Sequence, residues 1–164
     1  MRLTTARRLS RTRNNILWTL AAALALFSCS RNAVYSHYEP VSLDGWERSD
    51  TLFFDITTPR DSGVFSSELG VRITERYPYQ ELALVVEQTL LPAGKVTIDT
   101  VNVRLTDPEG HYEGKGLSII DTLVPMDDIA LGTTDTLKVS IRHMMRREVL
   151  PGISDIGITL EKKH

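Results

Sequence analysis

The sequence contains one cysteine, Cys29, among its 164 residues. A disulfide within the chain is therefore excluded, and the fold must rest on the packing of apolar side chains. The four histidines, His37, His111, His143 and His164, are scattered, and none stands two or four residues from another histidine or from the cysteine. This spacing matches no zinc-binding pattern, so we expect no metal ion.

Motifs of enzyme active sites are also missing from the sequence. There is no Gly-x-Ser-x-Gly nucleophile elbow and no glycine-rich phosphate loop. Two acidic groups, Asp127-Asp128 near Asp121 and Asp107 near Glu109, lack the spacing of a calcium loop, and we interpret them as solvated carboxylates. We therefore expect no catalytic residue and no cofactor, and we predict that the protein is not an enzyme.

The sequence also lacks the apolar periodicity of an α-helix. The nearest approach is His143 to Leu150, which we expect to form at most one or two helical turns before Pro151. Apolar residues recur instead with a period of two, or form a short continuous run, as in strands packed on a core. Six segments have this property: 52–56, 69–73, 82–86, 101–105, 137–141 and 156–160.

Turn-forming residues separate these six segments. Proline, glycine and aspartate gather at 59–63, 92–94, 107–110, 131–132 and 151–152. Short strands at this spacing predict an all-β fold, and we favour a single antiparallel β-sandwich domain. The spacing leaves two topologies open, immunoglobulin-like and jelly-roll.

The first 28 residues have the pattern of a secretory signal peptide. Five arginines and no acidic residue precede Ile16–Phe27, a stretch of twelve mostly apolar residues. Twelve residues rise about 18 Å as a helix, whereas a bilayer core is about 30 Å thick. We therefore expect cleavage rather than a retained transmembrane helix.

Cys29 stands directly after this apolar stretch. Leu26-Phe27-Ser28-Cys29 resembles the lipobox of bacterial lipoproteins, whose cysteine is joined to diacylglycerol, although Phe27 is bulkier than the usual occupant. Two or three acyl chains anchor a protein stably, whereas one chain anchors it only marginally. We predict a lipid attachment at Cys29, with a signal peptide over residues 1–28, a lipidated tether over 29–33 and a β-sandwich domain over 34–164.

Loss of the signal peptide changes the charge of the protein. It removes five positive charges and no negative one, so the formal net charge falls from −2 to −7. Nucleic acid binding needs clustered cations, so we exclude nucleic acid as a partner. Residue 30 is Ser rather than Asp, and no acidic run follows Cys29. This favours an outer-membrane lipoprotein on the periplasmic face.

Two segments carry candidate binding residues. In 72–82, Tyr77 and Tyr79 flank Pro78 close to Arg72, an arrangement suited to binding a protein or a sugar. The alternative is that both rings cap the end of the sandwich core. In 110–116, three glycines surround Tyr112, as in a tight hairpin or at a close approach of another backbone. The candidate partner-binding residues are Arg72, Tyr77, Tyr79 and Tyr112.

The order of several features along the chain is distinctive. A lipobox is followed by Tyr35–Tyr38, Trp46, Phe53-Phe54-Asp55, a strand with Arg72 before Tyr77-Pro78-Tyr79, the turn at 110–116, Met144-Met145-Arg146, Leu150–Ile153 and Asp155–Gly157. This succession resembles the gliding motility lipoprotein GldH family of the Bacteroidota. A departure is Arg147, which follows Arg146 where the family pattern has a single arginine.

The resemblance implies a non-enzymatic envelope lipoprotein, associated with machinery that works alongside type IX secretion and moves cell-surface adhesins. It carries over no catalytic residue, and only Cys29 has a defined chemistry. We thus expect a lipid-anchored binding or scaffold component with protein partners in the envelope. The alternative function is that of a glycan-binding β-sandwich module.

Overall fold

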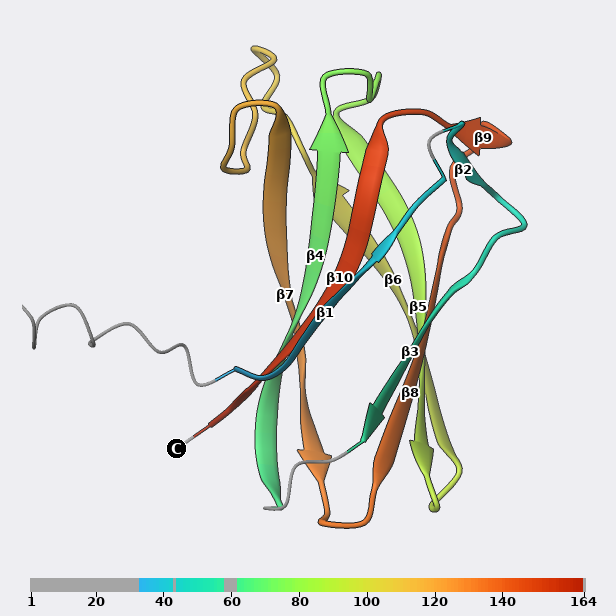
Figure 1. The fold of residues 1–164 in the computed structure, drawn as a ribbon, viewed down its shortest axis with the longest axis vertical. Helices are drawn as coiled ribbons and strands as arrows, with labels where there is room; N and C mark the ends of the chain where they lie inside the picture. Colours follow the sequence, from blue (N-terminus) through green and yellow to red (C-terminus); the bar gives the residue numbers. More distant parts are fainter. Residues whose placement is uncertain (1–32, 43, 58–61, 164) are drawn as a thin grey trace, which may run out of the picture. The chain divides into compact units, whose positions relative to one another are not determined.

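The computed structural model describes residues 33–42, 44–57 and 62–163, so the predictions for the signal peptide and Cys29 lie outside it. These residues form strands and no helix, and thus no helix that is long and apolar enough to cross a membrane (Figure 1). The strands are β1 (Ala33–Pro40), β2 (Trp46–Glu47), β3 (Leu52–Thr57), β4 (Gly63–Thr74), β5 (Glu81–Leu91), β6 (Lys95–Arg104), β7 (Ile119–Leu131), β8 (Thr136–His143), β9 (Val149–Leu150) and β10 (Ile153–Lys162).

The long strands form two four-stranded antiparallel sheets. The first sheet has the order β1-β10-β4-β7 and the second has the order β3-β8-β5-β6, while β2 and β9 pair with each other. If β2 and β9 are left out and the eight long strands are renumbered from 1 to 8 along the chain, the first sheet has the order 1-8-3-6 and the second has the order 2-7-4-5. This is the double Greek key of a jelly roll, so the structure selects one of the two predicted topologies.

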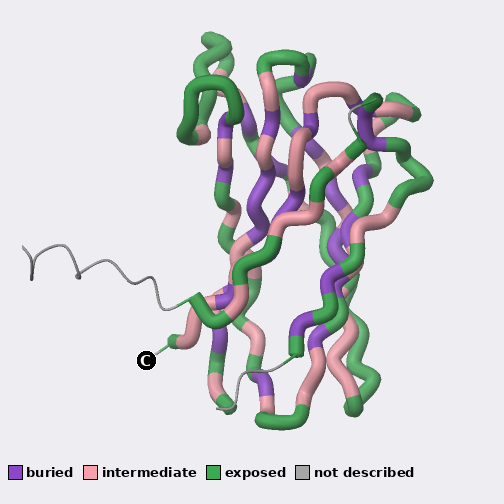
Figure 2. The backbone as a smooth tube through the Cα atoms, viewed as in Figure 1, coloured by how far each residue is buried: buried purple, intermediate pink, exposed green. Residues whose placement is uncertain are grey.

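The core lies between the two sheets, and the alternation in the sequence accounts for it. Every long strand except β1 contributes buried residues to it, whereas the turns are largely exposed (Figure 2). All six predicted strands are confirmed. The helical turns predicted within 143–150 are wrong, since this segment ends β8, bends and then forms β9.

The two ends of the sandwich differ. At one end Ala33 pairs with Glu161, and Gly63 pairs with Leu131. At the other end Thr74 pairs with Ile119, next to the loops 75–80 and 105–118. The first described residue therefore lies at the end opposite these two loops (Figure 1).

Tyr38 of the edge strand β1 lies across the outer face of the first sheet. It is aligned with Gly157 of β10, which is aligned in turn with Gly70 of β4. A Cβ atom at Gly157 would lie 2.6 Å from the Tyr38 ring, and one at Gly70 would lie 2.2 Å from its hydroxyl oxygen. Only glycine leaves room for the ring at both positions.

Two charged residues complete this arrangement. The Tyr38 hydroxyl donates to an Asp121 carboxylate oxygen of β7 at 3.3 Å. The Arg72 guanidinium carbon lies 3.7 Å from the centroid of the Tyr38 ring, and its Nε donates to Asp121 at 3.2 Å. One side chain thus connects all four strands of the sheet. We call Tyr38, Gly70, Arg72, Asp121 and Gly157 the Tyr38 latch.

We predict that Gly157→Ala destabilises the protein by about 1–3 kcal/mol, because the added methyl group overlaps the Tyr38 ring in a packed row. Urea unfolding measures this loss. Gly63→Ala is the matched control in the same sheet, since its Cβ would lie 3.2 Å from the flexible end of Lys162 and at an ordinary 3.9 Å from Phe65. In a Tyr38→Ala background, Gly157→Ala should cost much less. An equal cost in both backgrounds would contradict the latch.

His143 is a buried titratable residue at the end of β8. It is 0% exposed, and its ring packs edge-on against Trp46 with centroids 5.2 Å apart. Its Nε2 lies 3.2 Å from the Trp46 carbonyl oxygen, which can only accept, so Nε2 carries the proton. Nδ1 has no partner among the described residues. Burial lowers the pKa of His143, and the nearby charges of Arg48 and Glu148 act in opposite directions.

Protonation of His143 is therefore predicted to favour unfolding. Because its folded pKa lies below the ordinary 6.5, the unfolded chain takes up the proton first as the pH falls. The contribution of His143 to stability should be constant well above pH 6.5, and it should decline as the pH falls through 6.5, by up to about 1.4 kcal/mol per pH unit. Urea unfolding between pH 7.5 and 5.5 should show this slope, and His143→Gln should remove it. His111→Gln, at an exposed ring, is the control. A slope that persists in His143→Gln would refute this prediction.

Candidate partner-binding surface

The loop 105–118 is held by hydrogen bonds rather than left free. Gly110 N donates to Asp107 O at 3.1 Å, which closes a turn. The Asp107 carboxylate accepts His111 N at 2.7 Å, and this bond lowers the pKa of Asp107. Beyond the turn, Thr106 and Tyr112 form an antiparallel bridge. The first half of the loop is thus a short hairpin over 106–112, which begins earlier in the chain than the hairpin predicted over 110–116.

The second half of the loop folds back onto the start of β7. A Cβ atom at Gly114 would lie 2.6 Å from the Ile120 side chain. Gly116 has a φ of 139°, and a Cβ there would lie 1.8 Å from the Ile119 carbonyl oxygen. The glycines therefore allow a close backbone approach, the second feature that their spacing predicts. The next residue, Leu117, is 93% exposed.

Tyr77 and Tyr79 have different positions. Tyr77 is 6% exposed, and its hydroxyl donates to Glu81 O at 2.9 Å. Burial raises the pKa of this hydroxyl well above its ordinary value. The Tyr79 ring meets it edge-on at 5.8 Å and is 38% exposed. The sequence predicts both as contact residues, but Tyr77 is a core residue that supports Tyr79.

The two loops are joined through Gln80. Its carbonyl oxygen accepts Leu105 N at 2.8 Å and Thr106 N at 3.3 Å, beside the bridge to Tyr112. Exposed apolar and aromatic side chains therefore gather on neighbouring segments at this end of the sandwich. We call Tyr79, Tyr112, Leu117 and Ile119 the loop-end surface; Tyr112 is 39% and Ile119 is 46% exposed.

Arg72 belongs to the Tyr38 latch, where it contacts Tyr38 and Asp121. No hydrogen bond, ion pair or ring contact joins it to Tyr79 or Tyr112 within the described part of the chain. The sequence prediction missed Tyr38 and Asp121 as its partners. The sequence contains a sign of this contact, because Gly70 and Gly157 each interrupt a strand pattern. A glycine within a strand often marks a position that another part of the chain approaches closely.

Four clefts of the sandwich lie away from the loop-end surface. Two lie around Phe53, with Tyr35 and His37 on one side of it and Glu87 and Lys138 on the other. Two more lie along β6 and β7, lined in part by Asp99 and Asp127. Within the ranges that the structure describes, no three His, Cys, Asp or Glu side chains are placed to hold a metal ion.

Residues 33–160 match the family described as GldH lipoprotein. The gliding motility lipoprotein GldH of Flavobacterium johnsoniae is 28% identical over 153 residues, which cover 88% of this chain and 94% of that protein. A GldH homolog of Christiangramia forsetii is 28% identical over 144 residues, which cover 82% of this chain and 87% of that protein.

A solved structure, dimeric latent PorU from Porphyromonas gingivalis, is 9% identical with a TM-score of 0.27. This match covers 83% of this chain and 13% of that one, and it adds nothing to the fold described above.

The family match begins at the first residue of β1 and ends within β10, so it includes the whole sandwich. Membership in a lipoprotein family assigns the protein to a membrane of the cell envelope. It also agrees with the resemblance that the order of features in the sequence indicates. This chain belongs to the GldH lipoprotein family.

Proposed function

We propose that the protein is a non-enzymatic scaffold of the envelope, anchored through lipid at Cys29 and bound to a protein partner through the loop-end surface. The observation that carries this proposal is the gathering of exposed apolar side chains at the end of the sandwich opposite Ala33. The proposed location is the periplasmic face of the outer membrane. Ser30, in place of Asp, supports that location.

The geometry suits an anchor at one end and a partner at the other. Cys29 lies four positions before Ala33 in sequence, and four residue steps can span at most about 14 Å. Strand β4 runs the height of the sandwich over 12 residues, and at about 3.3 Å per residue this is roughly 40 Å. An anchored protein thus has its loop-end surface available on the side away from Ala33.

The chemistry of the loop-end surface favours a protein partner. Leu117 is 93% exposed, and burying a leucine side chain contributes about 1.5–3 kcal/mol. Aromatic residues such as Tyr79 and Tyr112 are enriched in protein interfaces, whereas the polar rim contributes less. Arg104 and Glu113, 3.9 Å apart and exposed, supply such a rim. Sugar binding gains no support from the aliphatic Leu117 and Ile119.

We predict that Cys29→Ala abolishes lipid attachment, because the thioether requires the only thiol in the chain. Cells grown with an alkyne-labelled fatty acid should label the native protein and the Ser30→Ala control, but not Cys29→Ala. The readout is the labelled band after immunoprecipitation, which does not depend on whether the variant's signal peptide is cleaved. Label on Cys29→Ala would contradict the anchor.

We predict that a photo-crosslinking amino acid at Leu117 forms a defined protein adduct in native membranes. The same group at Val64, 45% exposed at the opposite end, is the matched control and should not form it. Tyr79→Ala with Tyr112→Ala should weaken the interaction at least tenfold, a loss typical of central aromatic contacts. The thermal midpoint of this double variant is the folding control.

Two results would contradict the proposal that the loop-end surface binds a protein partner. One is an identical adduct from positions 117 and 64, which would mean that the crosslink does not report this surface. The other is binding of purified protein to a glycan array, abolished by the two tyrosine substitutions, which would establish the glycan-binding alternative.

A further inference from the structure

The sandwich is open along the side where β6 and β7 are the edge strands. Two clefts of about 240 and 150 Å³ adjoin there, and both are lined by Gln88, Asp99 and Asp127. Together they form one elongated channel, which we call the edge groove. It lies on the sides of the two sheets and does not include the loop-end surface.

The floor of the edge groove is apolar. Leu137 is buried beneath it, while Leu90 and Ile129 pack against the core but are only partly covered. Val101 and Met126, also partly covered, continue the floor along the second cleft. Apolar side chains are therefore available to a ligand that enters between the two strands.

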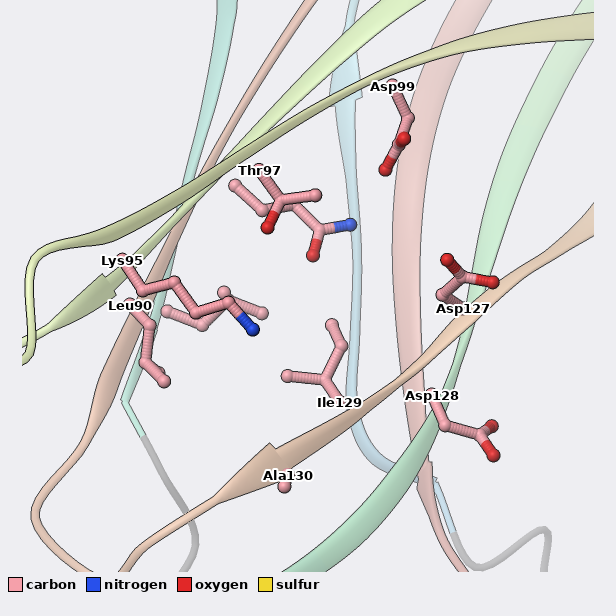
Figure 3. A pocket seen from close by; sticks show the side chains of 10 residues that line it. Leu90, Lys95, Thr97, Asp99, Asp127, Asp128, Ile129 and Ala130 are labelled. Carbon is pink, nitrogen blue, oxygen red and sulfur yellow. The ribbon is translucent and has the colours of Figure 1, made fainter.

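The groove is open because β6 carries polar residues on its inner face. Val101 and Val103 face the other sheet, and by alternation Lys95, Thr97 and Asp99 share that face. Figure 3 shows these three side chains on one side of the space, with Asp127 and Ile129 on the other. Three polar residues cannot close a dry core, so the sheets leave a channel here.

A β-bulge in β7 presents the carboxylates on the opposite side. Asp127 and Asp128 together face the single residue Ser66 of β4, where the register shifts. Ser67, only 1% exposed, donates its hydroxyl to the Asp127 carbonyl oxygen at 2.8 Å. A buried serine thus satisfies a carbonyl at the bulge. Bulges at sheet edges re-aim side chains, in this case two aspartates.

The edge groove is negatively charged. Asp99, Asp127 and Asp128 face one cation in the lining, Lys95. Asp128 pairs with Lys163, whereas Asp99 and Asp127 form no ion pair with any side chain in the described ranges. These carboxylates are not placed to hold a metal ion. The complementary ligand is therefore a positively charged side chain.

We infer that the edge groove is a second docking site, which takes an extended cationic segment of a partner protein. Apolar side chains of the segment cover Leu90 and Ile129, and a lysine or arginine reaches Asp99 and Asp127. Strands β6 and β7 are 10 and 13 residues long, and each is the last strand of its sheet. Lys115 pairs with the outer edge of β7 at Asp121, six residues before Asp127. An extended segment can add to such an edge through backbone hydrogen bonds.

A labelled nonapeptide of alternating valine and lysine tests this inference on the full-length protein in detergent. Fluorescence anisotropy should show binding of this peptide and none of a valine–glutamate counterpart. Asp99→Asn with Asp127→Asn should weaken binding at least tenfold, and Glu109→Gln at the exposed turn should leave it unchanged. Asp99→Lys with Asp127→Lys should reverse the preference between the peptides.

Hydrogen exchange locates the peptide, because the amides of β6 or β7 should gain protection on binding. Undiminished binding by the Asp99→Asn and Asp127→Asn variant, or protection elsewhere, would overturn the inference. Absence of binding would also overturn it, and would leave the inward polar residues as protection of an edge strand against aggregation. None of these outcomes involves Leu117 or Tyr79, so they are separate from the test of the loop-end surface.

Discussion

The contact of Tyr38 with Gly157 and Gly70 ties the edge strand β1 to the rest of the first sheet. Strand β1 is an edge strand with one neighbour, β10, and it directly follows the predicted lipidated tether. Any restraint that a membrane anchor puts on the sandwich passes through β1. The Tyr38 ring extends this attachment from one neighbouring strand to the whole sheet, because its hydroxyl reaches Asp121 on the far edge.

The sandwich separates this attachment from the residues available for binding. No disulfide is possible, so the separation is maintained by packing between the two sheets alone. Two buried hydroxyl groups lie next to residues that we propose for binding. The Tyr77 hydroxyl donates a hydrogen bond to Glu81 O, and the Tyr77 ring packs against Tyr79, which is partly exposed. The Ser67 hydroxyl donates a hydrogen bond to the carbonyl oxygen of Asp127, in the bulge of β7.

The sequence predicted those parts of the fold that depend on local pattern. Six strands were found because their core residues alternate, but β1 and β7 were missed. Strand β1 has no buried residue, and in β7 the buried position 122 is a threonine whereas the exposed position 123 is a leucine. The jelly roll depends on which strands pair, which no local pattern encodes. Of the candidate site residues, Tyr77 and Arg72 are differently placed than expected. For Tyr77, Pro78 indicates an extended loop but does not show which of the two neighbouring tyrosines is buried. For Arg72, the contact residue Tyr38 is too distant in sequence for a local pattern to reveal it.

The central claim is that the anchored sandwich presents its loop-end surface away from the membrane. Cys29 is the only native cysteine and would be acylated, so single cysteines at positions 64 and 117 can carry spin labels in membrane-bound protein. Electron paramagnetic resonance with a water-soluble and a lipid-soluble relaxant reports the depth of each label. We predict that the label at 117 contacts water only and lies farther from the bilayer than the label at 64. Contact of the label at 117 with lipid would contradict it.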